Sequence, residues 1–571
     1  MAPPRIALLF LALLMLVPVA GAEDWRDLSA DYSRYLARTD PLAAGQRGDH
    51  AAASRWPDDS PAAMATRQRE LAAFRQRLDG VAPGSLSETD ALSHAIMRRQ
   101  VDIALESLGF DEARIPFQDG EGFYTLPETQ AAMTVLNGRE GAEAWLARIA
   151  SIPAYFDMHT ENMRRGMRDR FTQPAQTVEK AARVLRGLAT EPPQDSALLL
   201  PFANLPAGEP AAAWRARAVA LIRDKVRPAQ ARLADFFQQD YLPRARASLG
   251  AGSLDKGRYY SFQIRRYTTL TLEPAAIHAM GQAEITRIKG EMARLLADSS
   301  FTGSARDYLL ALRADPANRA IDADDYGRRA AEIAKRAEYL LPRYFGTLPR
   351  LPYGVRQKPA GLDSISSGYL PGSPETRVAG AVIYGGGAGN DLAGLPAWLL
   401  HEGVPGHHLQ IALAQENRDL PDYRRLDDVT AFVEGWALYA ERLGEEMGIY
   451  RSVAERMGRL SMEAWRACRL VMDTGLHAMD WTRDQATSCL LENTGMSRDG
   501  AYRETDRYIG WPGQALGYKL GEMRIVALRR EAEERMGSRF DLRAFHDLLL
   551  SAGALPLDLL EQRVRGKTAT P

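Results

Sequence analysis

Residues 396–410 decide how the rest of the chain is interpreted, and they read Pro396-Ala397-Trp398-Leu399-Leu400-His401-Glu402-Gly403-Val404-Pro405-Gly406-His407-His408-Leu409-Gln410. Three of the nine histidines lie between positions 401 and 408, beside an acidic residue and after an apolar lead-in. Imidazole and carboxylate groups packed in this way are typical of a zinc hydrolase. The alternative is a set of solvated or helix-capping histidines, and the dense packing favours a metal.

A regular helix cannot bring these histidines to one metal. His407 lies about 240° around the helix from His401, and Pro405 occupies the i+4 position of the usual second ligand. His408 returns to the same face but lies about 10.5 Å further along the axis. Residues 403–406 include two glycines and a proline, which permit a kink or bulge. The spacing therefore predicts a distorted helix, with His407 or His408 as second ligand.

A third ligand is expected on another helix, and Glu434 is the best candidate. Residues 428–441 have a strongly helical pattern, and the neighbours of Glu434 three and four positions away are mostly small or apolar. A carboxylate on such a face is costly to bury unless it is paired or bound to a metal. The alternative is a buried Glu bonded to an Arg or Tyr. Glu441, two turns later on the same face, could orient a ligating histidine.

Outward from this region, most of the sequence predicts helices. Apolar positions recur at three- and four-residue spacing in residues 61–78, 88–108, 141–149, 210–241, 274–296, 324–340 and 514–535. Short Pro/Gly segments separate these stretches, without a long Ser/Gly linker or an internal repeat. We therefore expect one large, mainly α-helical body.

Residues 361–391 break the helical pattern. Gly, Ser, Tyr and β-branched residues predict a strand or hairpin at 376–384, which could pair with an extended peptide by edge addition. The glycine-rich residues 385–390 lack the Gly-Lys-Ser/Thr ending of a phosphate loop, so nucleotide binding is not expected.

The N-terminus predicts export. Arg5 precedes an apolar run at residues 6–17, and Ala20-Gly21-Ala22 follows. The run is shorter than the roughly 20 residues of a membrane-spanning helix, and it ends in a small-residue cleavage site. We expect a signal peptide at 1–22, cut before Glu23 and without a cysteine for lipid attachment. The mature domain, 23–571, is then periplasmic or secreted, with no membrane association after cleavage.

Composition limits the function classes. The chain has 571 residues, of which 46% are hydrophobic and 25% charged, and its formal net charge is -1. These values are typical of a globular protein without the basic field that attracts nucleic acid. Its two cysteines, Cys468 and Cys489, cannot form a four-cysteine zinc site. They could be bridged in an oxidising compartment, although the sequence does not give their separation. The oligomeric state is not indicated.

The motifs together resemble a known family. His-Glu-x-x-Pro-Gly-His-His-x-Gln at 401–410 and Phe-x-Glu-Gly-Trp-Ala-Leu-Tyr at 432–439 are similar to the bacterial family DUF885, which itself resembles gluzincin metallopeptidases. Residues 256–260, 473–477 and 507–519 are similar to further family blocks. The resemblance implies a multi-helical metallopeptidase-like body with a small β-hairpin or sheet beside the metal-binding helix, and a core at roughly 361–525.

The resemblance also implies one Zn²⁺ held by two histidines and a downstream Glu, here His401, His407 and Glu434. Matching the family's Gly-His step to residues 406–407 favours His407 over His408. Glu402 would then be the general base that accepts a proton from water and returns it to the leaving amine. Three side chains are candidates for the second oxyanion donor, each with a structural role as its alternative: Tyr508, Tyr518 and His477.

The sequence thus predicts a zinc-dependent peptidase acting on oligopeptides. Four basic side chains could grip a substrate carboxylate or form ordinary ion pairs: Arg265, Arg266, Arg377 and Lys519. Carboxypeptidase, dipeptidase and endopeptidase action therefore stay open, although an enclosing helical body favours short peptides. The alternatives are a zinc amidase with a non-peptide substrate, and a non-catalytic binding protein with a structural metal. Glu402 argues against the latter, because a structural site needs no base.

Overall fold

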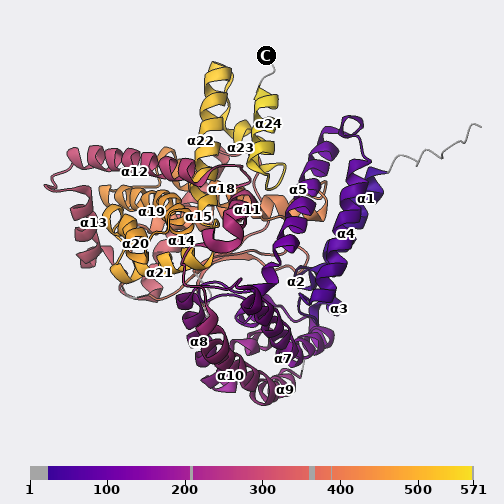
Figure 1. Ribbon diagram of the computed structural model, residues 1–571. Coiled ribbons are helices and arrows are strands. Elements are labelled where there is room, and N and C mark those ends of the chain that lie inside the picture. Colours follow the sequence, from indigo (N-terminus) through magenta and orange to yellow (C-terminus); the bar gives the residue numbers. More distant parts are fainter. Residues whose placement is uncertain (1–23, 206–209, 359–366, 388, 569–571) are drawn as a thin grey trace, which may run out of the picture.

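The computed structural model describes residues 24–205, 210–358, 367–387 and 389–568. These residues form a mainly α-helical molecule with one small sheet, as the periodicity of the sequence predicts (Figure 1). The predicted signal peptide lies outside the described residues. Within them, no helix is both long and apolar enough to cross a membrane.

The N-terminal helices stand together at one side of the molecule (Figure 1). They are α1 (Trp25–Thr39), α2 (Pro41–Gln46), α3 (His50–Ala53), α4 (Pro61–Asp79) and α5 (Glu88–Phe110). Ser60 and Ser87 cap α4 and α5 by accepting hydrogen bonds from backbone N–H groups of the first turn. Tyr32, Leu71 and Met97 are buried in the apolar cluster that joins α1, α4 and α5.

A second group of helices forms the lower lobe in Figure 1. It contains α6 (Leu126–Met133), α7 (Gly138–Asp169), α8 (Ala175–Thr190), α9 (Ala211–Leu221) and α10 (Arg227–Phe236), with π-helical turns at Ile222–Val226 and Phe237–Tyr241. Aromatic side chains dominate its core, including Trp145, Phe156 and Phe237. Burial of such large rings supplies most of the apolar area that holds a lobe of this kind together.

The C-terminal half surrounds the histidine-rich segment. Its helices are α11 (Arg258–Thr268), α12 (Pro274–Ala297), α13 (Ala305–Ala314), α14 (Ala323–Leu340), α15 (Leu395–Glu402), α16 (His407–Glu416), α17 (Asp422–Arg425), α18 (Thr430–Glu446), α19 (Val453–Ala478), α20 (Arg483–Asn493), α21 (Arg498–Gly510), α22 (Leu516–Met536), α23 (Leu542–Leu550) and α24 (Leu557–Thr568). Helices α18 and α22 pack closely, because a Cβ atom on Gly521 would lie 1.8 Å from the carbonyl oxygen of Ala431.

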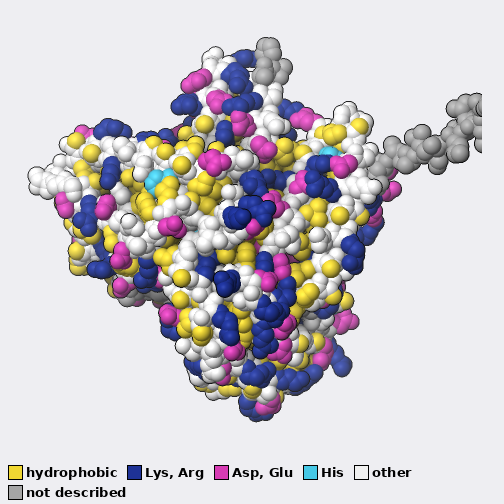
Figure 2. All heavy atoms as spheres, viewed as in Figure 1, with side chains coloured by type: hydrophobic (Ala, Val, Ile, Leu, Met, Phe, Trp, Pro, Cys, Tyr) yellow, Lys and Arg dark blue, Asp and Glu magenta, His cyan; other side chains and the backbone are white. Residues whose placement is uncertain are grey.

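Short 3₁₀ helices link these elements. They are Pro83–Ser85, Glu112–Arg114, Pro193–Asp195, Ala197–Asn204, Leu242–Arg244, Ala251–Gly257, Pro316–Asn318, Leu341–Arg343 and Gly537–Arg539. Acidic and basic side chains intermix over much of the face in Figure 2, which agrees with the near balance of 72 basic and 73 acidic residues.

The sheet differs from the prediction in its extent and its edges. It contains β1 (Tyr353–Gln357), β2 (Gly368–Leu370) and β3 (Gly380–Tyr384) in the order β1-β3-β2. Strand β3 begins at residue 380 rather than 376, and β1 lies before the region in which a strand was expected. Because β3 pairs in parallel with β1 and antiparallel with β2, it has no free edge. The prediction that an extended peptide could pair with this strand by edge addition is therefore wrong.

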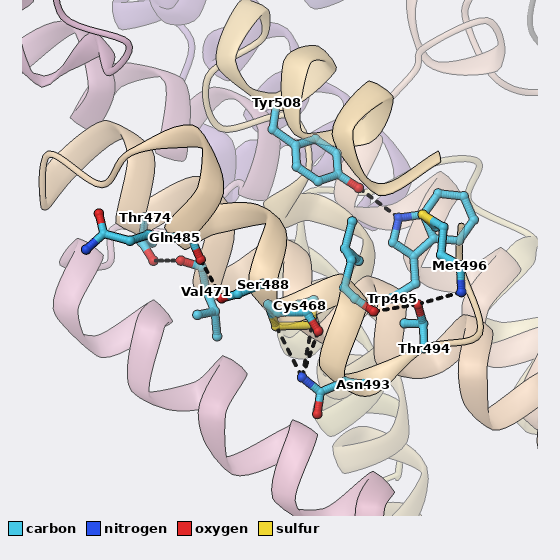
Figure 3. The surroundings of a disulfide bond; sticks show 12 residues. Trp465, Cys468, Val471, Thr474, Gln485, Ser488, Asn493, Thr494, Met496 and Tyr508 are labelled. Atoms are coloured by element: carbon cyan, nitrogen blue, oxygen red, sulfur yellow. Dashed lines mark hydrogen bonds between the residues drawn. A yellow bond between two sulfur atoms is a disulfide. The ribbon is translucent and has the colours of Figure 1, made fainter. Parts of the chain in front are cut away.

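The two cysteines form a disulfide that joins α19 to α20 (Figure 3). Their Cα atoms are 5.7 Å apart, a separation that the sequence does not give. The amide of Asn493 donates to the carbonyl oxygen of Cys489, next to the bridge. Helix α19 also contacts α15, which carries His401.

Candidate metal centre

The histidine-rich segment is two helices rather than one distorted helix. Helix α15 ends at Glu402, and α16 begins at His407 after the turn formed by residues 403–406. The indole Nε1–H of Trp436 donates to the carbonyl oxygen of Pro405 and fixes this turn on α18. At Gly406 a Cβ atom would lie 2.1 Å from the carbonyl oxygen of His401, so only glycine fits. The two extra residues therefore form a turn instead of a bulge.

This break brings three candidate donor atoms together. His401 Nε2 lies 3.2 Å from Glu434 Oε2, and His407 Nε2 lies 3.5 Å from the same oxygen. The three atoms lie within 4.8 Å of one another. Glu434 Oε2 is buried, and in the part of the chain that the structure describes it has no hydrogen-bond partner. A buried oxygen without a partner is costly, and a cation would remove that cost.

A second carboxylate orients the first histidine. Glu441 Oε1 lies 2.8 Å from His401 Nδ1, which leaves Nε2 directed at Glu434. Burial alone would lower the pKa of His401, but its contacts with Glu434 and Glu441 raise that pKa to about 9. Burial would raise the pKa of Glu434, and His407 and His401 hold it well below its ordinary value. In zinc sites, a carboxylate commonly accepts the second N–H of a ligating histidine and so orients its ring.

His408 does not join this group. Its Nδ1 lies 2.9 Å from the hydroxyl of Tyr369, and its ring packs against Tyr353 with the ring centroids 4.4 Å apart. Burial lowers the pKa of His408 to about 4, so the ring is neutral at pH 7. Of the two adjacent histidines, the geometry therefore places His407 with His401 and Glu434.

Glu402 lies at the end of α15, next to the candidate ligands. Its Oε2 accepts a hydrogen bond of 2.8 Å from the backbone N–H of Tyr369 on β2. A Cβ atom on Gly368 would lie 3.4 Å from the same oxygen, so the strand runs close past the carboxylate. Glu402 is only partly buried and lines the same cleft as the three donors. Strand β2, rather than β3, borders this cleft.

The cleft has a volume of about 1570 Å³ and lies between the N-terminal helices and the half that carries the candidate ligands. Tyr32 of α1 and Leu71 of α4 line one wall, and His401 and His407 line the other. Pockets for small ligands typically measure about 300–1,000 Å³. The larger volume here accommodates an extended molecule of several residues.

Of the three predicted oxyanion donors, the structure brings only Tyr518 to the cleft. Its ring is half-buried, and desolvation together with the nearby charge of Glu434 raises its pKa. Tyr508 instead donates its hydroxyl proton to Glu504 and accepts from Trp465 and Arg469.

His477 lies on α19 and is bonded only to backbone. Its Nδ1 accepts from the N–H of Ala251, and its Nε2 lies 3.0 Å from the carbonyl oxygen of Tyr508. Neither nitrogen is free for a substrate. The prediction of His477 as an oxyanion donor failed because the sequence around a histidine does not show which distant backbone groups it bonds.

The basic residues considered for a substrate carboxylate have other partners. Lys519 is fully buried among three glutamates, Arg265 pairs with Glu106, and Arg377 is on the surface. Arg266 lines the cleft but is paired with Glu112. The sequence prediction missed two other cleft residues, Arg466 and Arg469. The available signal was a row of charged residues at three- and four-residue spacing on one face of this helix, namely Arg459, Glu463, Arg466, Arg469 and Asp473.

Comparison with known proteins agrees with the sequence motifs. The chain belongs to the family described as "Bacterial protein of unknown function (DUF885)", which matches residues 41–564. No curated protein matches the sequence.

Two solved structures are similar along nearly the whole chain. A protein described as a "putative lipoprotein" from Colwellia psychrerythraea is 26% identical, with a TM-score of 0.88, and the match covers 96% of this chain and 100% of that one. A second protein, described as "a putative lipoprotein of unknown function" from Shewanella oneidensis, is 19% identical, with a TM-score of 0.69 and coverage of 95% and 99%. The second match shows a common fold only.

Proposed function

We propose that this chain is an exported zinc-dependent metallopeptidase that hydrolyses oligopeptides, with a site of the gluzincin type. The observation that carries the proposal is the buried, unpartnered oxygen of Glu434 facing His401 Nε2 and His407 Nε2. A general base candidate, Glu402, lies beside these donors in a cleft large enough for a peptide. A purely structural metal needs neither the cleft nor the base.

The spacing of the donors fits zinc. Zinc–nitrogen and zinc–oxygen bonds of about 2.0–2.1 Å in a tetrahedron place neighbouring donor atoms about 3.3 Å apart. The distances of 3.2 and 3.5 Å agree with that value. Three protein ligands are the usual number in a catalytic zinc site, because the fourth position serves the reaction. His401, His407 and Glu434 would hold the ion, with Glu441 orienting His401 from behind.

The remaining roles belong to the side chains around these donors. When bound, zinc lowers the pKa of water towards neutrality and polarises a carbonyl group. Glu402 accepts the proton that water loses and delivers it to the leaving nitrogen of the peptide. The phenol O–H of Tyr518 donates a hydrogen bond to the carbonyl oxygen of the substrate as negative charge develops there. The helices on both sides of the cleft exclude bulk water and large folded substrates.

Export is part of the same proposal. The N-terminal sequence has the pattern of a cleaved signal peptide, and the Cys468–Cys489 disulfide is expected in an oxidising compartment. The similar Colwellia protein is described as a "putative lipoprotein", which is also an envelope location. N-terminal sequencing of periplasmic protein should begin at Glu23, and material that still begins at Met1 would contradict export by cleavage.

The function is tested by incubating purified protein with a mixed peptide library and reading the products by mass. Cleavage should occur with zinc, stop with a chelator and return when zinc is restored. If the peptides stay intact but small amides are hydrolysed, the protein is an amidase rather than a peptidase. Stoichiometric zinc without any hydrolysis would leave only a structural metal.

A further inference from the structure

Arginine side chains form part of the cleft wall behind the candidate metal centre. Arg466 and Arg469 lie on α19, which packs against the ligand-bearing helix α15. The Arg469 side chain is only 4% exposed, yet it borders the cleft. Such a buried guanidinium is costly unless its N–H groups have acceptors.

The guanidinium of Arg469 is held along one edge only. Its Nε–H donates to the hydroxyl of Tyr508, and its Cζ lies 4.0 Å from the ring centroid of Tyr518 and 4.9 Å from that of Trp465. Trp465 in turn donates to Tyr508 (Figure 3). One hydrogen bond and two ring contacts thus orient the guanidinium.

The opposite edge of Arg469 lacks acceptors. Among the described residues, Nη1 is buried without a hydrogen-bond partner, and Nη2 lies 3.8 Å from Glu504, beyond hydrogen-bond distance. The geometry of two parallel N–H groups matches a carboxylate, which accepts from both at once. An edge of this kind, oriented but unsatisfied, is what a carboxylate-binding arginine requires.

Further charged groups lie around Arg469. Arg466 and Arg507 border the same cleft. Glu504 accepts hydrogen bonds from Arg507 and Tyr508, and Glu441 is shared between Arg466, at 3.5 Å, and the candidate ligand His401. These two carboxylates are engaged by other partners, and neither accepts a hydrogen bond from Nη1 of Arg469.

We propose that Arg469, supported by Arg466 and Arg507, forms a subsite that binds a carboxylate of the peptide substrate. This inference rests on the proposed peptidase function and narrows its substrate class. The C-terminal carboxylate is the source that every unmodified short peptide provides, and its capture beside the metal centre would make the enzyme an exopeptidase acting from the C-terminus. A Glu or Asp side chain offers the same chemistry.

The test measures binding of three probes by calorimetry to zinc-loaded Glu402→Gln protein, which retains the ligands but lacks the base. The probes are N-acetyl-tetraalanine as the free acid, the same peptide as its C-terminal amide, and an amidated peptide with one internal Glu. The free acid should bind roughly 10- to 100-fold more tightly than the amide, the value of a hydrogen bond to a charged group. Arg469→Gln should remove that preference, and Arg469→Lys should retain only part of it, because lysine keeps the charge but not the fork.

Arg266→Gln is the matched control, since this arginine lines the same cleft but is paired with Glu112. It should leave the preference for the acid unchanged. If the amidated peptide with an internal Glu binds tightly and this binding also depends on Arg469, the subsite binds a side-chain carboxylate rather than the C-terminal one.

Equal binding of all three probes, or no binding of any, would overturn the subsite. The affinities of the free acid and the amide are compared on Glu402→Gln protein with Arg469 intact. The test therefore stays valid even if an Arg469 variant fails to fold. If the wild-type enzyme leaves every peptide intact while Glu402→Gln protein still prefers the acid, the peptidase proposal fails and the carboxylate subsite stands.

Discussion

Among the residues that the structure describes, two clusters of three ligand-type side chains lie close enough together to hold a metal ion, and they differ in the groups at their centres. The first consists of His401, His407 and Glu434, and the second of Glu284, Glu463 and Glu522. In the second cluster Lys519 Nζ lies 2.8–2.9 Å from all three carboxylates. Burial would lower the pKa of this lysine, but the carboxylates raise it, so the cluster contains its own cation.

Among the described residues, the first cluster has no lysine or arginine at its centre, so its positive charge must come from a proton on a histidine or from a metal ion. Its central oxygen, on Glu434, has no hydrogen-bond partner, although it lies between two histidines. The two clusters teach that the distances between donors do not identify a metal site. What identifies it is a donor set whose charge and hydrogen bonds are unsatisfied by the protein itself.

The largest expected effect is loss of the metal. His401→Ala, His407→Ala and Glu434→Ala should each abolish stoichiometric zinc binding, because three protein ligands leave none to spare. His408→Ala is the matched control and should keep its zinc, since this ring bonds Tyr369 instead. Metal analysis of the four purified proteins measures this. Zinc lost from the His408 variant but kept by the His407 variant would reverse the assignment of the second ligand.

Within the first cluster, Glu402 separates binding from chemistry. Glu402→Gln keeps the size of the side chain and its acceptor for the Tyr369 N–H but removes the base. Peptide cleavage should fall by about 10²–10⁴-fold, the usual contribution of general acid–base catalysis. Zinc content and melting temperature should match the wild type. A variant that loses its zinc would make Glu402 a ligand, and one that cleaves normally would place the base elsewhere.

The second cluster should respond in stability rather than in metal content. Lys519→Met leaves the buried Glu522 without its cation, whereas Glu284 and Glu463 keep Arg287. Removal of one partner of a buried ion pair typically costs about 3–5 kcal/mol of unfolding free energy. Zinc content should stay unchanged, because the lysine does not contact His401 or His407. Lys335→Met, at an exposed pair with Glu338, is the control and should unfold as the wild type does. Denaturant unfolding and metal analysis of the purified proteins measure this. A Lys519→Met protein that lost zinc but kept its stability would refute the distinction between the two clusters.

The sequence predicted the helices, and it predicted that His401, His407 and Glu434 lie together. A 3.6-residue period is visible within one segment, and the Gly/Pro content of residues 403–406 already required a break. It did not predict that the break is a full turn, because that depends on Trp436, thirty-one residues from its partner Pro405. Strand β1 was missed for a similar reason, since a short, half-exposed strand forms only when β3 lies beside it.

The polar residues of the site were the least predictable part. Arg469 and His477 lie two turns apart on α19, and both are buried. Arg469 borders the cleft, and its Nη1 has no hydrogen-bond partner among the described residues, whereas His477 bonds the backbone of Ala251, 226 residues away. A single sequence shows that a helix carries buried polar residues but not which distant atoms satisfy them. Only tertiary contacts distinguish the residue that borders the cleft from the structural one.

Two fully buried histidines, His401 and His477, differ in their pKa values because their neighbours differ. His401 lies between carboxylates, which raise its pKa to about 9, whereas burial among backbone groups lowers the pKa of His477 to about 3. A histidine with a lowered pKa is neutral in the folded protein and gains a proton on unfolding below about pH 6.5. Its contribution is therefore present above pH 6.5 and is lost progressively as the pH falls towards 3.

Replacing His477 should remove this part of the acid sensitivity. From pH 7 to pH 5, His477 alone should cost the wild type about 2 kcal/mol of unfolding free energy, because the unfolded chain binds the proton and the folded one does not. His477→Asn can still accept from the Ala251 N–H but cannot titrate, so its unfolding free energy should be lower at pH 7 and should fall less between the two values. Urea unfolding of both proteins at pH 7 and pH 5 measures the difference, and all other titrating groups cancel. If both proteins lose the same unfolding free energy between pH 7 and pH 5, His477 is not held neutral in the folded protein. Backbone contacts would then not distinguish its pKa from that of His401.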